Sequence, residues 1–189
     1  MKEEPRALTD PPGGVLIWFV IFMELVTFIA GIYFYFSYRH DNLELFREMQ
    51  KKLNLTFAIF NPIFLVTSGY FVALALGFLK KLDRIRCRKY LLVGIFFGFG
   101  FILLKSFEYY EKINQGLTTS LNHFFTFYWF LTFFHYMHVV FATIILIFLF
   151  FKLKKEEENE INALEVGASL WHMCDLIWIL LFPTLFFIR

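Results

Sequence analysis

Long apolar runs alternate with short charged segments along the whole chain. A helix that crosses a membrane needs about 20 consecutive apolar residues, because the hydrocarbon core is ~30 Å thick and each helical residue adds ~1.5 Å. Five runs reach this length. They cover residues 15–38, 56–79, 90–110, 123–151 and 167–188. The pattern therefore predicts an all-α integral membrane protein with five transmembrane helices.

The polar segments between these runs are too short to form a second domain. The first apolar run also lacks the short apolar core and small-residue cleavage site of a signal peptide, so it is predicted to remain in the mature protein. We therefore expect residues 1–189 to form a single five-helix transmembrane domain.

The composition supports a membrane location and excludes several protein classes. Hydrophobic residues make up 59% of the chain and the mean hydropathy is +0.61, whereas about 45–50% apolar residues is typical of soluble domains. A soluble enzyme is therefore excluded. The net charge of +2 argues against nucleic acid as a partner, because binding to phosphates requires a concentrated excess of cations. The two cysteines, Cys87 and Cys174, are too few for a disulfide-rich secreted scaffold.

The lysines and arginines of the connections predict the orientation of the helices. Eleven of them fall in the N-terminal segment and in the connections after the second and fourth runs, and six fall in the other connections and at the C-terminus. Segments rich in Lys and Arg stay in the cytoplasm. The N-terminus is therefore predicted to be cytoplasmic and the C-terminus to lie outside.

Several ionisable side chains lie inside the predicted spans, where they are costly and mark functional hypotheses. His135 and His138 share one helical face, as do His172 and Asp175, because both pairs are separated by three residues. Helical depth estimates suggest that these four side chains and Glu24 could meet in one layer. The full set comprises Glu24, Lys105, Glu108, His135, His138, His172 and Asp175.

Four interpretations of this set follow from the residues alone. Two histidines with nearby carboxylates could bind iron or zinc, although the Glu-x-x-His motif of bundle di-iron sites is missing. Histidines from different helices could be axial haem ligands. The carboxylates and histidines could also form a proton relay. Finally, the groups could hydrogen-bond between helices and fix their packing.

The order of the polar motifs carries a resemblance to a known family. The segments LLKSFEYYEKI (103–113), FHYMHVVFAT (134–143) and LWHMCDLIWILLF (170–182) resemble, in order, the last three spans of subunit III of the haem-copper cytochrome c oxidases. The segments FMELVTFIAGIYFYF (22–36) and FNPIFLVTSGYFVALAL (60–76) look like its preceding two. With five spans instead of seven, the chain looks most like the NorE-type subunits that accompany bacterial nitric oxide reductases. Lys105 stands where the family usually has glutamine.

This resemblance implies an accessory subunit of the bacterial inner membrane, without catalytic residues, haem or copper of its own. Its partner would be the catalytic subunit I, which holds the haem and copper of an oxidase or nitric oxide reductase, and it would bind phospholipids and support sustained turnover. The polar set then forms a structural intramembrane network of Glu24, Glu108, His135, His138, His172 and Asp175, with Trp171, Trp178 and Lys105 at packing or interface positions. The alternative is a stand-alone proton-conducting or transporter-like membrane protein.

Overall fold

The computed structural model describes residues 13–153 and 160–188, except for the side chains of residues 55 and 56. Over these residues the chain forms α-helices and no strand. The helices are α1 (Val15–Asp41), α2 (Leu43–Lys51), α3 (Leu55–Lys80), α4 (Arg84–Asn114), α5 (His123–Lys152) and α6 (Glu160–Phe186). All but α2 are long and apolar enough to cross a membrane, which confirms the all-α class and the five predicted spans. The polar N-terminal segment and the charged segment 154–159 lie outside the described residues.

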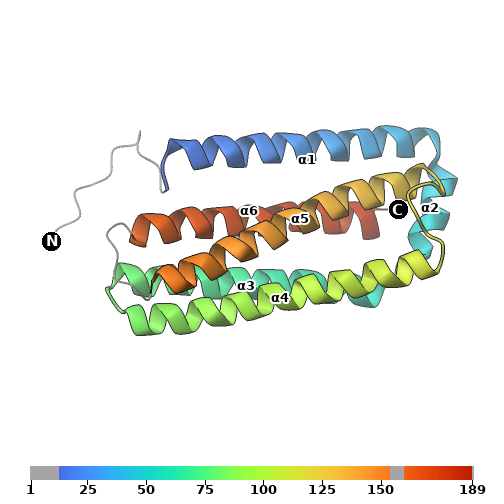
Figure 1. Ribbon diagram of the computed structural model, residues 1–189. Helices are drawn as coiled ribbons and strands as arrows, with labels where there is room; N and C mark the ends of the chain where they lie inside the picture. The colour runs from blue at the N-terminus through green and yellow to red at the C-terminus, as the bar shows by residue number, and fades with distance from the viewer. Residues whose placement is uncertain (1–12, 154–159, 189) are drawn as a thin grey trace.

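The five long helices lie side by side and alternate in direction (Figure 1). The helix α6 is central, since it packs against α1, α3 and α5, and the most extensive helix pair is α3 with α4. The start of α4 and the end of α5 lie at the same end of the bundle, which we call the basic end. The connection between α4 and α5 lies at the opposite end, together with α2.

Two of the long helices begin earlier than the apolar runs predicted. The helix α4 begins at Arg84, six residues before the predicted start at 90, and α6 begins at Glu160, seven residues before 167. Hydropathy detects the part of a helix that lies in hydrocarbon, whereas charged residues extend a helix into the interfacial layer, where their polar groups reach water. Asp83 caps α4 by accepting a hydrogen bond from the backbone N–H of Arg86 at 3.0 Å, and Asn122 caps α5 in the same way.

The short helix α2 was not predicted, because its segment is polar overall and was treated as a connection. Its apolar residues nevertheless recur on one face, and Phe46 on that face is fully buried. The Phe46 ring packs edge-on against Tyr35 of α1 and Phe124 of α5, with centroids 5.3 and 5.5 Å apart. The buried Gln50 amide of α2 also donates a hydrogen bond of 3.1 Å to the backbone carbonyl of Leu185, so an aromatic and a polar side chain anchor this helix to the bundle.

Small residues allow α4 to approach its neighbours closely. The Ser68 hydroxyl of α3 donates a hydrogen bond of 2.6 Å to the backbone carbonyl of Gly94 in α4. A Cβ atom at Gly98 would come within 2.5 Å of the Trp171 ring of α6. The tight contact of α3, α4 and α6 therefore depends on glycine at these positions.

Candidate functional site

A cluster of charged side chains is buried between α3, α4 and α5. Lys105 and Glu108 are completely buried, and Lys112 is 3% exposed. The Glu108 carboxylate lies 2.9 Å from the Lys105 ammonium and 3.3 Å from that of Lys112. Two cations thus share one carboxylate, in an environment where an unpaired charge costs several kcal/mol. We call these three residues, with Tyr128 and Asn61, the Glu108 cluster.

Both oxygen atoms of Glu108 have two polar neighbours each. The Tyr128 hydroxyl of α5 donates to Oε1 at 2.5 Å, and the Asn61 amide of α3 donates to Oε2 at 3.2 Å. Lys112 and Lys105 occupy the remaining positions on Oε1 and Oε2. The carboxylate therefore joins three helices through charge-assisted hydrogen bonds, which are the stronger kind.

Aromatic rings surround the Lys105 ammonium. It lies 4.9 Å from the ring centre of Trp178 and 5.1 and 5.3 Å from those of Tyr109 and Tyr128. Cation–π attraction of this kind grows when water is excluded. The aromatic rings thus help to stabilise the Lys105 ammonium, which is completely buried and does not reach water.

His135 is fully buried beside this cluster and stacks on Trp178, with ring centroids 5.1 Å apart. The edge of Phe101 faces the imidazole at 6.0 Å. Among the described residues, neither ring nitrogen of His135 has a hydrogen-bond partner. His135 therefore contributes to the packing of the bundle chiefly through its ring.

A second polar group joins α1 to α5. His138 Nε2 lies 3.1 Å from the Glu24 carboxylate, an ion-pair distance, and His138 Nδ1 lies 2.8 Å from the backbone carbonyl of Phe134. Both side chains are partly exposed and line a hollow of about 130 Å³. Cys174 of α6 also lines this hollow.

A third polar group lies on α6 where this helix meets α3. His172 Nδ1 and Asp175 Oδ2 are 3.2 Å apart, with His172 nearly half exposed. The Asp175 carboxylate lies directly against Gly69 of α3, so a Cβ atom at Gly69 would collide with it. Glycine at this position therefore provides the space that the carboxylate occupies.

The structure places the predicted site residues in separate groups. It brings Glu24 to His138 and His172 to Asp175, while Glu108 contacts Lys105 and His135 lies among aromatic rings. No hydrogen bond joins these groups to one another among the described residues. Trp171 and Trp178 are both buried inside the bundle.

Sequence reasoning missed three members of the Glu108 cluster: Asn61, Lys112 and Tyr128. Lys112 was counted with the charges of a connection, although its spacing of four residues from Glu108 places both on one helical face. Asn61 and Tyr128 belong to other helices, so no spacing along the chain indicates their contact with Glu108.

No group of three or more His, Cys, Asp or Glu side chains among residues 13–153 and 160–188 could hold a metal ion. The arrangement of the described polar side chains can nevertheless do two things. The Glu108 cluster can lock three helices together, and the Glu24–His138 pair can join α1 to α5 beside its hollow.

Two comparisons with known proteins indicate the same family over nearly the whole chain. Residues 14–189 match the family model for cytochrome c oxidase subunit III. The chain is 28% identical over 179 residues to a protein of Nocardia farcinica named "Probable cytochrome c oxidase subunit 3". This alignment covers 93% of the chain and 87% of the Nocardia protein.

Proposed function

Because the chain belongs to the cytochrome c oxidase subunit III family, and is therefore a multi-pass membrane subunit of a haem-copper oxidase, we propose that its role is accessory and non-catalytic. It packs against the catalytic subunit I in the bacterial inner membrane and supports assembly, phospholipid binding and sustained turnover. In this proposal the haem and copper belong to the catalytic subunit, and this chain holds neither.

One observation carries the accessory role: the Glu108 carboxylate is saturated by partners of its own chain. Each of its oxygens interacts with two neighbours from α3, α4 or α5. An acid whose acceptor positions are all occupied holds helices together. It has no free position for a ligand or a substrate, so this buried carboxylate supports a structural function.

The test compares the purified enzyme complex with and without this chain. We expect the complex without the chain to keep its haem spectrum and initial turnover rate, but to lose activity after fewer turnovers. The proposal fails if the initial rate falls with removal of the chain, or if the purified chain alone carries stoichiometric haem or metal.

The proposed orientation places the N-terminus in the cytoplasm and the C-terminus outside. The turn between α3 and α4, with the lysines and arginines that flank it, and the connection between α4 and α5 lie at opposite ends of the bundle, as this orientation requires (Figure 1). Lys112 was counted on the less basic side, yet it is buried in the Glu108 cluster. The sequence count for the less basic end therefore included one lysine that does not lie at the surface.

We also assign the chain to the NorE-type subunits, because it has five spans and resembles them in its motifs. The partner would then reduce nitric oxide. A nitric oxide electrode and an oxygen electrode measure which of the two gases the purified complex consumes. Turnover with oxygen alone would place the chain with the oxidases instead.

A stand-alone proton-conducting function is the second candidate, and the Glu24–His138 pair favours it. This pair joins two titratable groups at a hollow that reaches the surface of the bundle. The assay is proton flux into liposomes that contain this chain alone. The accessory role predicts no flux above that of empty liposomes, whereas flux that disappears in Glu24→Gln would support conduction.

A further inference from the structure

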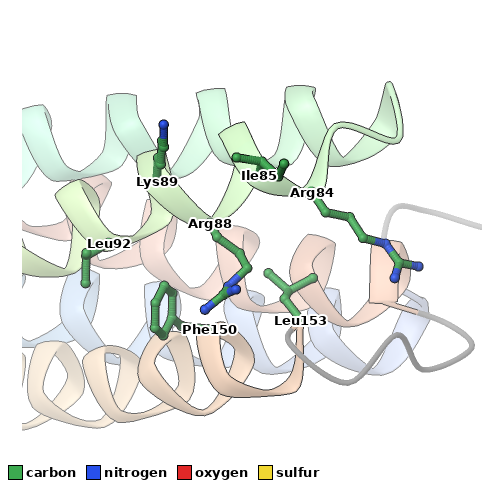
Figure 2. Close-up of a pocket in the computed structure, with 7 residues that line it drawn as sticks. All are labelled: Arg84, Ile85, Arg88, Lys89, Leu92, Phe150 and Leu153. Atoms are coloured by element: carbon green, nitrogen blue, oxygen red, sulfur yellow. The ribbon is translucent and has the colours of Figure 1, made fainter.

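A hollow of about 410 Å³ lies between the start of α4 and the end of α5, at the basic end of the bundle (Figure 2). It opens where two membrane-spanning helices reach the edge of the hydrocarbon layer. Its wall combines cationic and apolar side chains from both helices. A ligand that fits it must therefore be anionic at one end and apolar at the other.

The cationic part of the wall comes from the first turns of α4. The Arg88 guanidinium lies over the Phe150 ring, 5.0 Å from its centre, and points from α4 toward α5 (Figure 2). Arg84 is 3.3 Å from the Glu160 carboxylate, so its charge is already shared. Lys89 lines the hollow, and its ammonium points away from Phe150. Arg88 is thus the main cation that faces the hollow.

Arg88 also has hydrogen-bonding capacity that the described protein does not use. Its Nε atom is shielded from solvent and has no hydrogen-bond partner among the described residues. A guanidinium offers several N–H donors in a planar fork that matches the geometry of a phosphate group. A phosphate oxygen in the hollow would satisfy this donor.

The apolar part of the wall continues toward the middle of the membrane. Leu92, Phe150 and Leu153 line the hollow. Along α4 the same face continues through exposed side chains, since Leu92 is 53%, Phe96 69% and Leu103 46% exposed. Residues separated by four or seven positions share a helical face, so these side chains form a continuous apolar track for an acyl chain.

We propose that this hollow binds an anionic glycerophospholipid, whose phosphate is held by Arg88 and whose acyl chain lies along the exposed face of α4. Basic pockets between membrane helices on the cytoplasmic side are suited to anionic head groups. The inference rests on the proposed function, because it specifies the class of phospholipid that the subunit binds and requires the basic end to face the cytoplasm.

The test measures lipid binding to the full-length chain in detergent by native mass spectrometry. Phosphatidylglycerol is compared with phosphatidylcholine of the same acyl chains, and inorganic phosphate is added as a competitor. We expect tighter binding of phosphatidylglycerol and about a fivefold loss of that preference in Arg88→Gln, the effect of one cation near a membrane surface. Arg88→Lys keeps the charge and should retain most of the preference.

Arg86→Gln is the matched control, because Arg86 lies on the same helical turn but contacts Phe78 and Asp83 instead of the hollow. It should leave the preference unchanged. Equal binding of the two lipids, or equal losses in Arg88→Gln and Arg86→Gln at unchanged thermal stability, would overturn the inference. Full displacement of the lipid by inorganic phosphate would assign the hollow to free phosphate instead.

Co-purification of the catalytic subunit with each variant separates the two proposals. A chain that assembles with its partner but shows no preference for phosphatidylglycerol refutes the lipid site alone. A chain that binds phosphatidylglycerol but never co-purifies with a catalytic subunit refutes the accessory function.

Discussion

Replacing Glu108 by glutamine should destabilise the bundle more than replacing the lysine next to it. The Glu108 cluster contains two ammonium groups and one carboxylate, all buried. Glu108→Gln leaves two cations without a counter-ion. Lys105→Gln leaves the carboxylate paired with Lys112 at 3.3 Å and still bonded to Tyr128. The two substitutions remove one charge each, yet their consequences for the balance of charge are opposite.

The magnitudes follow from this difference. Removing one partner of a buried ion pair costs roughly 3–5 kcal/mol when the other charge stays unpaired. For Glu108→Gln we expect a loss in this range. For Lys105→Gln we expect about 1–3 kcal/mol, which corresponds to an unsatisfied buried hydrogen-bonding group. Thermal unfolding of both variants in the same detergent, monitored by the loss of the helical circular dichroism signal, measures which variant is less stable.

The double variant gives the sharpest test of the charge argument. Glu108→Gln with Lys105→Gln leaves one buried cation, whereas Glu108→Gln alone leaves two. The double variant should therefore unfold at a higher temperature than the Glu108→Gln single variant, although it carries one more substitution. Additive losses, or a Lys105→Gln variant less stable than Glu108→Gln, would refute the reasoning that charge balance controls the stability of this cluster.

Two further predictions concern the packing of α3 and the orientation of the bundle. Gly69→Ala should lower the unfolding temperature, because its Cβ would collide with the Asp175 carboxylate, whereas Gly77→Ala, where a Cβ meets no atom within 4 Å, should not; equal effects of the two would show that the contact with Asp175 is unimportant. Lys51→Cys should react with a membrane-impermeant maleimide in intact spheroplasts, whereas Lys81→Cys should react only after lysis, because the proposed orientation puts the two positions on opposite sides of the membrane. Both native cysteines are buried, so they should add little background labelling. The reverse pattern would contradict the proposed orientation.

The number of spans could be predicted from the sequence because hydrocarbon thickness sets a minimum length of apolar residues. The helix ends at Arg84 and Glu160 could not, since charged residues that continue a helix lower its hydropathy without breaking its hydrogen bonds. The helix α2 was missed for a related reason. Its amphipathic face lies at one end of the bundle, where no long apolar run is needed.

The candidate site shows the same limit of local patterns. A spacing of three residues places Lys105 and Glu108 on one helical face, and the structure shows their charged groups 2.9 Å apart. The expectation that Glu24 and the other polar residues could meet in one layer rested on depth alone. Depth does not determine which way a side chain points around the helix axis, and the structure separates them into different groups.

The short turn between α3 and α4 affects how the protein enters the membrane. Only residues 81–83 separate the two helices, and so short a connection allows them to insert as one hairpin. Asn61, Lys105 and Lys112, which surround Glu108, all lie within this hairpin, and α5 adds Tyr128. The acidic side chain can thus be neutralised before the rest of the chain leaves the ribosome. The translocon would then release a hairpin with a paired carboxylate into the lipid, and the later helices would assemble on a unit whose most costly charge is already compensated.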